Sequence, residues 1–65
     1  MPLINVNMAT GRTPEQKRKL MAAITAAVQE SIGAPLGSIR VWISEFEPEE
    51  FMAAGELLSE RQAGN

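Results

Sequence analysis

The chain has 65 residues, a mass of 7.1 kDa and a formal charge of −2, and it contains no cysteine, histidine or aspartate. These absences exclude disulfide scaffolds, zinc fingers, cysteine nucleophiles and Ser–His–Asp triads. Six Lys and Arg against eight Glu, spread along the chain, make no basic surface for nucleic acid. No apolar run is long enough for a membrane span or a signal peptide, so we expect a cytoplasmic protein.

The small size of the chain predicts self-association. A domain of this length buries only about 60% of its unfolded surface and usually needs a disulfide, a metal ion or a partner chain. Apolar residues nevertheless make up 45% of the sequence, which is typical of a folded protein. We therefore expect one domain over residues 1–65 that completes its core with copies of itself.

The first half of the chain predicts a strand followed by a long helix. In residues 3–8 polar and apolar side chains alternate, which is typical of a strand with one apolar face. Thr13, Pro14 and Gln16 then form a capping-box helix start, and apolar residues recur at spacings of three and four up to residue 32. Gly33 is placed to end the helix.

The second half predicts another strand over residues 39–45 and a polar turn over 47–50. Residues 51–58 fit either a short hairpin or a helical turn, and residues 62–65 look like a frayed end. Strand, helix and strand make an α+β fold with a β-α-β protomer and parallel strands. Trp42 falls on the strand face that one helix leaves open, so we expect a second chain to cover it.

Few residues can carry chemistry. If Met1 is removed, Pro2 exposes a secondary amine, which apolar surroundings and nearby cations would keep neutral and basic; alternatively, it is an ordinary first residue of a strand. Arg12 precedes a helix start, where it forms either an anion-binding corner or a solvated turn. Arg40 either pairs with a glutamate or binds an anionic ligand.

Glutamates are the remaining candidate bases, and five of the eight lie in one segment, from Glu45 to Glu56. Such a run is more typical of a solvated surface than of an acid–base pair, and its spacing matches no pattern of metal ligands.

Several short motifs together resemble the 4-oxalocrotonate tautomerase family. The match spans nearly the whole chain without gaps, and it is the combination of motifs at these spacings that is specific. The motifs are Pro2-Leu3-Ile4, Gly11-Arg12-Thr13, Glu15-Gln16-Lys17, Ala34-Pro35, Ser38-Ile39-Arg40-Val41, Phe51 and Gly55-Glu56.

The resemblance implies a β-α-β protomer assembled as a homo-oligomer, a hexamer or a related trimer of dimers, without metal or cofactor. It implies that Pro2 is the catalytic base, that Arg12 and Arg40 bind the carboxylate and carbonyl groups, and that Phe51 lines an apolar pocket. The implied reaction is keto–enol tautomerisation of dienol carboxylates similar to 2-hydroxymuconate and 4-oxalocrotonate, in the catabolism of aromatic compounds.

Two features depart from the family pattern. Met52-Ala53-Ala54-Gly55 replaces a glycine-rich stretch, which should stiffen the hairpin and narrow one wall of the pocket. Ala9 replaces a larger aliphatic residue, which should open another wall.

Two other functions are weighed against tautomerisation. Dehalogenases or hydratases of the superfamily, which act on acids of the 3-haloacrylate type, carry a glutamate where this chain has Ala53, although Glu49 or Glu50 is close by in the sequence. A non-catalytic assembly subunit is favoured if Met1 is retained, because Met1 converts the Pro2 amine into an amide.

The geometry of a parallel β-α-β unit constrains the site. Pro2 begins the first strand and Arg12 follows its end, so about 20 Å separates them at roughly 3.3 Å per residue. A small dicarboxylate cannot span that distance, so Arg12 must come from a neighbouring subunit. Arg40 begins the second strand at the same end as Pro2.

Overall fold

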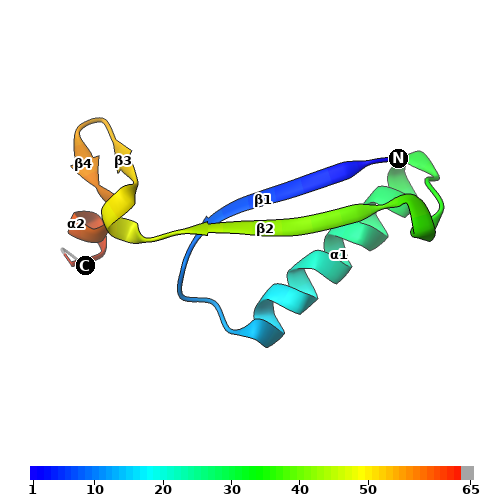
Figure 1. Cartoon of the computed structure of the whole chain (residues 1–65), viewed down its shortest axis with the longest axis horizontal. Helices are drawn as coiled ribbons and strands as arrows, with labels where there is room; N and C mark the ends of the chain where they lie inside the picture. Colours follow the sequence, from blue (N-terminus) through cyan, green and yellow to red (C-terminus); the bar gives the residue numbers. More distant parts are fainter. Residues whose placement is uncertain (64–65) are drawn as a thin grey trace.

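A two-stranded parallel sheet and one long helix form the main body of the protein. The computed structural model describes residues 1–63. β1 (Leu3–Ala9) and β2 (Arg40–Phe46) pair in register from Leu3 opposite Arg40 to Ala9 opposite Phe46. α1 (Pro14–Ile32) connects the two strands and covers one face of the sheet (Figure 1). The predicted β-α-β protomer with parallel strands is therefore confirmed.

Alternation along each strand decides which side chains meet the helix. The half-buried apolar side chains on the helix side are Ile4, Val6, Met8, Val41 and Ile43. Glu45 lies on the same side of β2, and its Oε1 is 3.2 Å from Lys17 Nζ of α1. This ion pair, with each side chain 27% exposed, ties the beginning of the helix to the end of the strand.

The ends of α1 are fixed by the residues that the sequence indicates. The Gln16 N–H donates to Thr13 Oγ1 at 3.1 Å, and the Thr13 N–H donates to Gln16 Oε1 at 3.0 Å, which completes the capping box. Gly33 ends the helix with φ of 72°, a left-handed conformation that glycine adopts without strain. A short 3-10 turn, η1 (Leu36–Ser38), then leads into β2.

The C-terminal part contains both of the alternatives that the sequence left open. After the 3-10 turn η2 (Pro48–Glu50), β3 (Met52–Ala53) pairs antiparallel with β4 (Glu56–Leu57), and the helix α2 (Leu58–Ala63) follows. The expected fraying is wrong for residues 62 and 63, which belong to α2. Residues 64 and 65 lie outside the described part of the chain.

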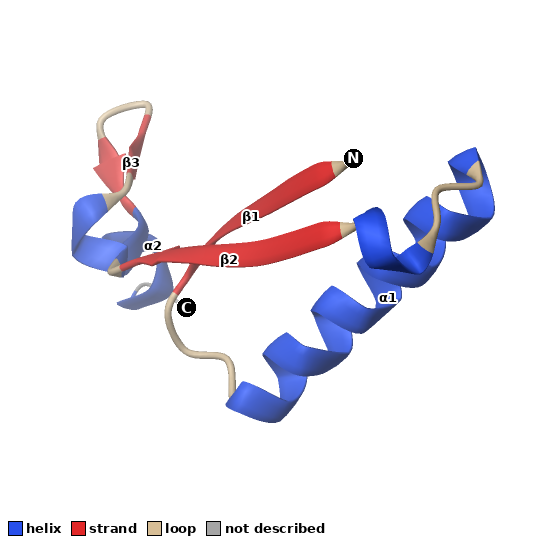
Figure 2. Ribbon diagram, turned by 45° about the vertical axis from the view of Figure 1, so that its right-hand side comes forward, coloured by secondary structure: helices blue, strands red, loops and turns tan. Residues whose placement is uncertain are grey.

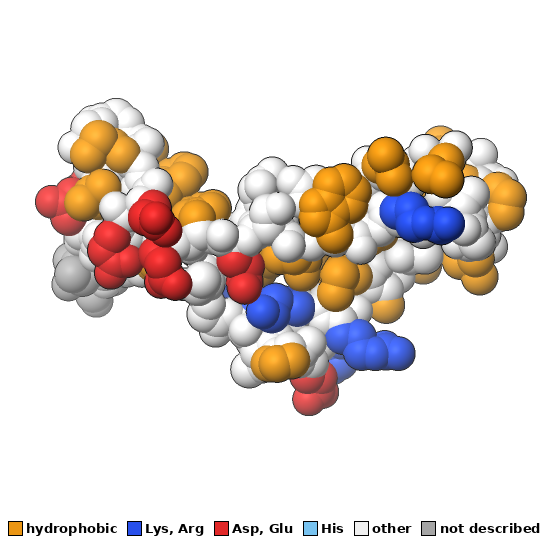
Figure 3. Space-filling view, viewed as in Figure 1, with side chains coloured by type: hydrophobic (Ala, Val, Ile, Leu, Met, Phe, Trp, Pro, Cys, Tyr) orange, Lys and Arg blue, Asp and Glu red, His pale blue; other side chains and the backbone are white. Residues whose placement is uncertain are grey.

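The protomer has almost no core of its own. Of the residues whose side chains the structure describes, only Ile39 is buried, at 8% exposure. Apolar side chains gather instead on the surface (Figure 3), and Figure 2 shows no element covering the second face of the β1–β2 sheet. Trp42 lies on that open face at 47% exposure. No helix between residues 1 and 63 combines the length and the hydropathy that crossing a membrane requires.

Candidate active site

Pro2 and Arg40 lie side by side at one end of the sheet. The Arg40 N–H donates to the Pro2 carbonyl oxygen at 3.0 Å, which continues the parallel pairing of β1 and β2 by one residue. Pro2 is half-buried, whereas Met1, which precedes it, is 80% exposed. Pro2 therefore lies at the end of the sheet where both strands begin, next to the residue that carries a guanidinium group.

The Arg40 guanidinium is held by its own turn. Nη1 donates to the carbonyl oxygens of Gly37 and Ile39, the second at 3.4 Å. Within the described part of the chain Arg40 forms no ion pair with a glutamate, so the first of its two predicted roles is not found in the protomer. Its side chain is exposed, and its charge is available to an anion at this end of the sheet.

Arg12 lies beyond the opposite end of β1, in the loop that leads into α1 (Figure 1). An anion-binding corner at this position would combine Arg12 with free N–H groups at the start of the helix. The capping box occupies the N–H groups of Thr13 and Gln16, and Pro14 has none. The exposed guanidinium of Arg12 is therefore the cationic group of this corner.

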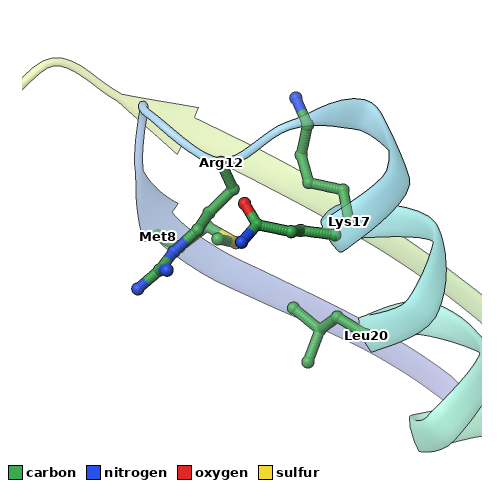
Figure 4. A pocket seen from close by; sticks show the side chains of 5 residues that line it. Met8, Arg12, Lys17 and Leu20 are labelled. Carbon is green, nitrogen blue, oxygen red and sulfur yellow. The ribbon is translucent and has the colours of Figure 1, made fainter.

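A hollow of about 340 Å³ lies beside Arg12, between β1 and α1 (Figure 4). Its lining is formed by Met8, Arg12, Gln16, Lys17 and Leu20. In Figure 4 the guanidinium of Arg12 and the ammonium of Lys17 point in different directions, in keeping with the pairing of Lys17 with Glu45. The sequence did not indicate this hollow, because it depends on how the helix packs across the strand.

Phe51 lies at the hairpin end of the molecule, after η2. Its ring stacks on that of Phe46, with the ring centroids 5.0 Å apart and the ring planes at 17°. Phe51 remains 43% exposed, so one part of the ring is open to contact. Sequence reasoning missed Phe46; the available signal was that the only two phenylalanines of the chain flank one short polar turn.

Most carboxylates of the acidic segment have local structural roles. Glu45 pairs with Lys17, Glu47 Oε2 accepts from Thr10 Oγ1 at 3.2 Å, and Glu50 Oε1 accepts from the Glu47 N–H at 3.3 Å. Glu56 lies 3.7 Å from Arg61, with both side chains largely exposed. Among residues 1–63 no three acidic side chains are grouped so that they could hold a metal ion.

The protomer thus brings together Pro2 and Arg40 and keeps Arg12 and Phe51 away from them. Seven residues of β1 separate Pro2 from the loop of Arg12, about 23 Å at roughly 3.3 Å per residue. Figure 1 shows the N-terminus and the β3–β4 hairpin at opposite ends of the molecule. A site that uses all four residues therefore needs a second chain.

Fold and sequence define a class of enzyme, the tautomerases. The family described as "Tautomerase enzyme" matches residues 2–61. The 2-hydroxymuconate tautomerase of Bacillus subtilis is 42% identical over 62 residues, which are 95% of this chain and 100% of that relative. The chain belongs to the tautomerase family, in its 4-oxalocrotonate tautomerase group, and is accordingly an isomerase.

Solved structures agree with this assignment. A 4-oxalocrotonate tautomerase isozyme of Methylibium petroleiphilum superimposes with a TM-score of 0.92 at 41% identity, covering 98% of this chain and 100% of the other. The heterohexameric 4-oxalocrotonate tautomerase of Chloroflexus aurantiacus J-10-fl gives 0.88 at 33% identity, covering 92% and 97%. The α+β fold and the family that the sequence resembles are thus confirmed.

Proposed function

We propose that this tautomerase acts on dienol carboxylates similar to 2-hydroxymuconate and 4-oxalocrotonate, with the Pro2 amine as general base and acid after removal of Met1. The carrying observation is the hydrogen bond from the Arg40 N–H to the Pro2 carbonyl oxygen. It holds Arg40, the residue that carries the guanidinium group, beside Pro2, whose nitrogen would move the proton. No histidine, cysteine or aspartate competes for that role.

In the proposed reaction the neutral Pro2 nitrogen removes the proton of the substrate hydroxyl group. The electron pair shifts along the conjugated system, and the protonated amine returns the proton to a carbon atom. The substrate is isomerised without net gain or loss of atoms. Arg40 stabilises the oxyanion that develops and the carboxylate next to it, because a preorganised charge favours the transition state most.

Arg12 is proposed to bind the distal carboxylate and Phe51 to form an apolar wall of the site. Each would come from a neighbouring copy, because the length of β1 separates Arg12 from Pro2 and Phe51 follows η2 beyond the far end of β2. The open sheet face with Trp42 and the very small core of the described residues support a homo-oligomer, for which a hexamer is the proposed state. We further propose one domain over residues 1–65, a cytoplasmic location and a place in aromatic catabolism.

The reaction class is tested by comparing two substrates. Ketonisation of 2-hydroxymuconate, followed by ultraviolet absorbance, should proceed with a far higher kcat/KM than halide release from 3-chloroacrylate. The reason is that Ala53 offers no carboxylate to orient water, and Glu50 is engaged by the Glu47 N–H. A larger kcat/KM for halide release would identify a dehalogenase instead, and the absence of both activities would favour a non-catalytic subunit.

A further inference from the structure

The stack of Phe46 and Phe51 joins the end of β2 to the segment that follows the turn η2. Phe46 is the last residue of β2, and Phe51 follows η2. With centroids 5.0 Å apart and planes at 17°, the rings are stacked nearly parallel, and stacked aromatic pairs are attractive beyond their buried area. The orientation of Phe51 is therefore tied to that of Phe46.

The backbone of Phe46 is held by the end of the β1–β2 ladder. It pairs with Ala9 at the end of the β1–β2 ladder, and the Thr10 N–H donates to its carbonyl oxygen at 2.9 Å. The Thr10 side chain continues this connection, since its hydroxyl group donates to Glu47 Oε2 at 3.2 Å. The end of β1 thus holds both Phe46 and the first residue of the turn that follows.

The turn between the two rings is closed by its own hydrogen bonds. The Glu50 N–H donates to the Glu47 carbonyl oxygen at 2.8 Å, and the Glu47 N–H donates back to Glu50 Oε1. Beyond the turn, the Leu58 N–H donates to the Phe51 carbonyl oxygen at 2.9 Å. The backbone of Phe51 is therefore fixed on both sides, and the stack fixes its ring.

The stacked rings belong to the open face of the sheet. By alternation along β2, Phe46 shares with Trp42 and Arg40 the face that α1 does not cover. Its neighbour on that face in β1 is Ala9, whose methyl group fills little space beside the ring. Ala9, Phe46 and the exposed part of Phe51 are thus placed to form one continuous apolar surface.

We propose that Phe46 is a positioning residue for Phe51 and that the two stacked rings, with Ala9 beside them, form one wall of the substrate site. This inference rests on the proposed function, because it takes Phe51 to face the substrate of a neighbouring copy. Two flat rings and a methyl group form a flat apolar wall, which suits planar, conjugated substrates, including enols that carry an aromatic ring.

The kinetic test uses Phe46→Leu, which removes the stack, and Phe46→Tyr, which keeps a ring in place. With phenylenolpyruvate as substrate, Phe46→Leu should raise KM about three- to tenfold, the effect of losing one aromatic pair, while kcat changes less. Phe46→Tyr should restore the wild-type KM. Val28→Ala, a half-buried change on α1 far from the rings, controls for a general loss of stability.

A structural test does not depend on activity. Because the chain has only two phenylalanines, protein with ¹³C-labelled phenylalanine gives signals from only these two rings. In Phe46→Leu the remaining Phe51 signals should move toward the values of a freely rotating ring, while the oligomeric mass is unchanged. Unchanged Phe51 signals, or an unchanged KM in a folded Phe46→Leu protein, would overturn the inference. If the wild type has no tautomerase activity but the rings are coupled, the proposed function fails and the positioning role stands.

Discussion

The amide of Arg40 donates a hydrogen bond to the carbonyl oxygen of Pro2, with 3.0 Å between the two atoms. Because this contact is made by the two backbones, it does not depend on the Arg40 side chain. Replacement of that side chain should leave Pro2 in place and remove only the charge. The contact therefore allows the electrostatic role of Arg40 to be measured separately from the position of the base.

The two arginines should affect different kinetic constants. Arg40→Ala should lower kcat about a hundredfold for monoacid and dicarboxylate enols alike, because its charge is matched to the oxyanion of the transition state. Arg12→Ala should raise KM about tenfold or more for dicarboxylates and little for monoacids, because it binds a distal carboxylate. Steady-state kinetics with 2-hydroxymuconate and phenylenolpyruvate would measure both effects.

Arg18→Ala provides a matched control, since Arg18 is an exposed cation of α1 close to Arg12 in sequence but outside the hollow. It should leave all constants near those of the wild type. Equal effects of Arg12→Ala on both substrates would show that Arg12 does not recognise the distal carboxylate.

The Pro2 amine should give the reaction one ascending pH limb. Since only the neutral amine accepts a proton, kcat/KM should rise with pH through a single ionisation of the free enzyme and then become level. Pro2→Ala, correctly processed, keeps a primary amine in the same place and should retain partial activity with a shifted profile. The measurement is kcat/KM from about pH 5 to 9, a range that includes the ordinary pKa of an α-amino group.

Retention of Met1 offers the complementary test. A variant that keeps Met1, verified by intact mass, has an amide nitrogen at Pro2 and should lose far more activity than Pro2→Ala. Equal turnover by Met1-retained and processed protein would show that Pro2 is not the base.

Trp42 should lie in the contact between subunits. Light scattering after size exclusion should give a multiple of 7.1 kDa, with six as the expected number. Trp42→Glu places a charge on the open sheet face and should shift the protein toward smaller species or unfold it, since burying an unpaired charge is unfavourable. Lys19→Glu, an exposed change on α1, should leave the mass unchanged. A folded wild-type monomer would contradict both the assembly and the shared site.

The β3–β4 hairpin contains a strained residue. Ala54 has φ of 53° and Gly55 has φ of 81°, and a left-handed conformation costs an alanine about 1 kcal/mol. Ala54→Gly should therefore raise the free energy of unfolding by up to about 1 kcal/mol in urea titrations at fixed protein concentration. Ala53→Gly is the control, because Ala53 lies in β3 and the same change there should destabilise the hairpin. A loss of stability in Ala54→Gly would exclude strain at this turn.

The sequence by itself determined the β-α-β core and its boundaries to within one residue at the ends of the strands. These elements are local: the alternation before Ala9, the capping box of Thr13 and Gln16, and the left-handed glycine at position 33 each act within a few residues. The order strand, helix, strand then leaves a parallel pairing as the expected outcome. The motifs around Pro2, Arg12 and Arg40 also indicated the family, which the relatives confirm.

Only the tertiary structure decided which atoms of the site residues meet. The pairing of Pro2 with Arg40 and the stacking of Phe46 on Phe51 depend on strand register and on the path of the turn, which residue patterns do not encode. Residues 51–58 are too few for their pattern to distinguish a hairpin from a helix, and the structure contains both in succession. The separation of Arg12 from Pro2, in contrast, follows from the predicted strand, because an extended strand holds its two ends apart, whereas the place of Phe51 depends on the path of the chain after β2.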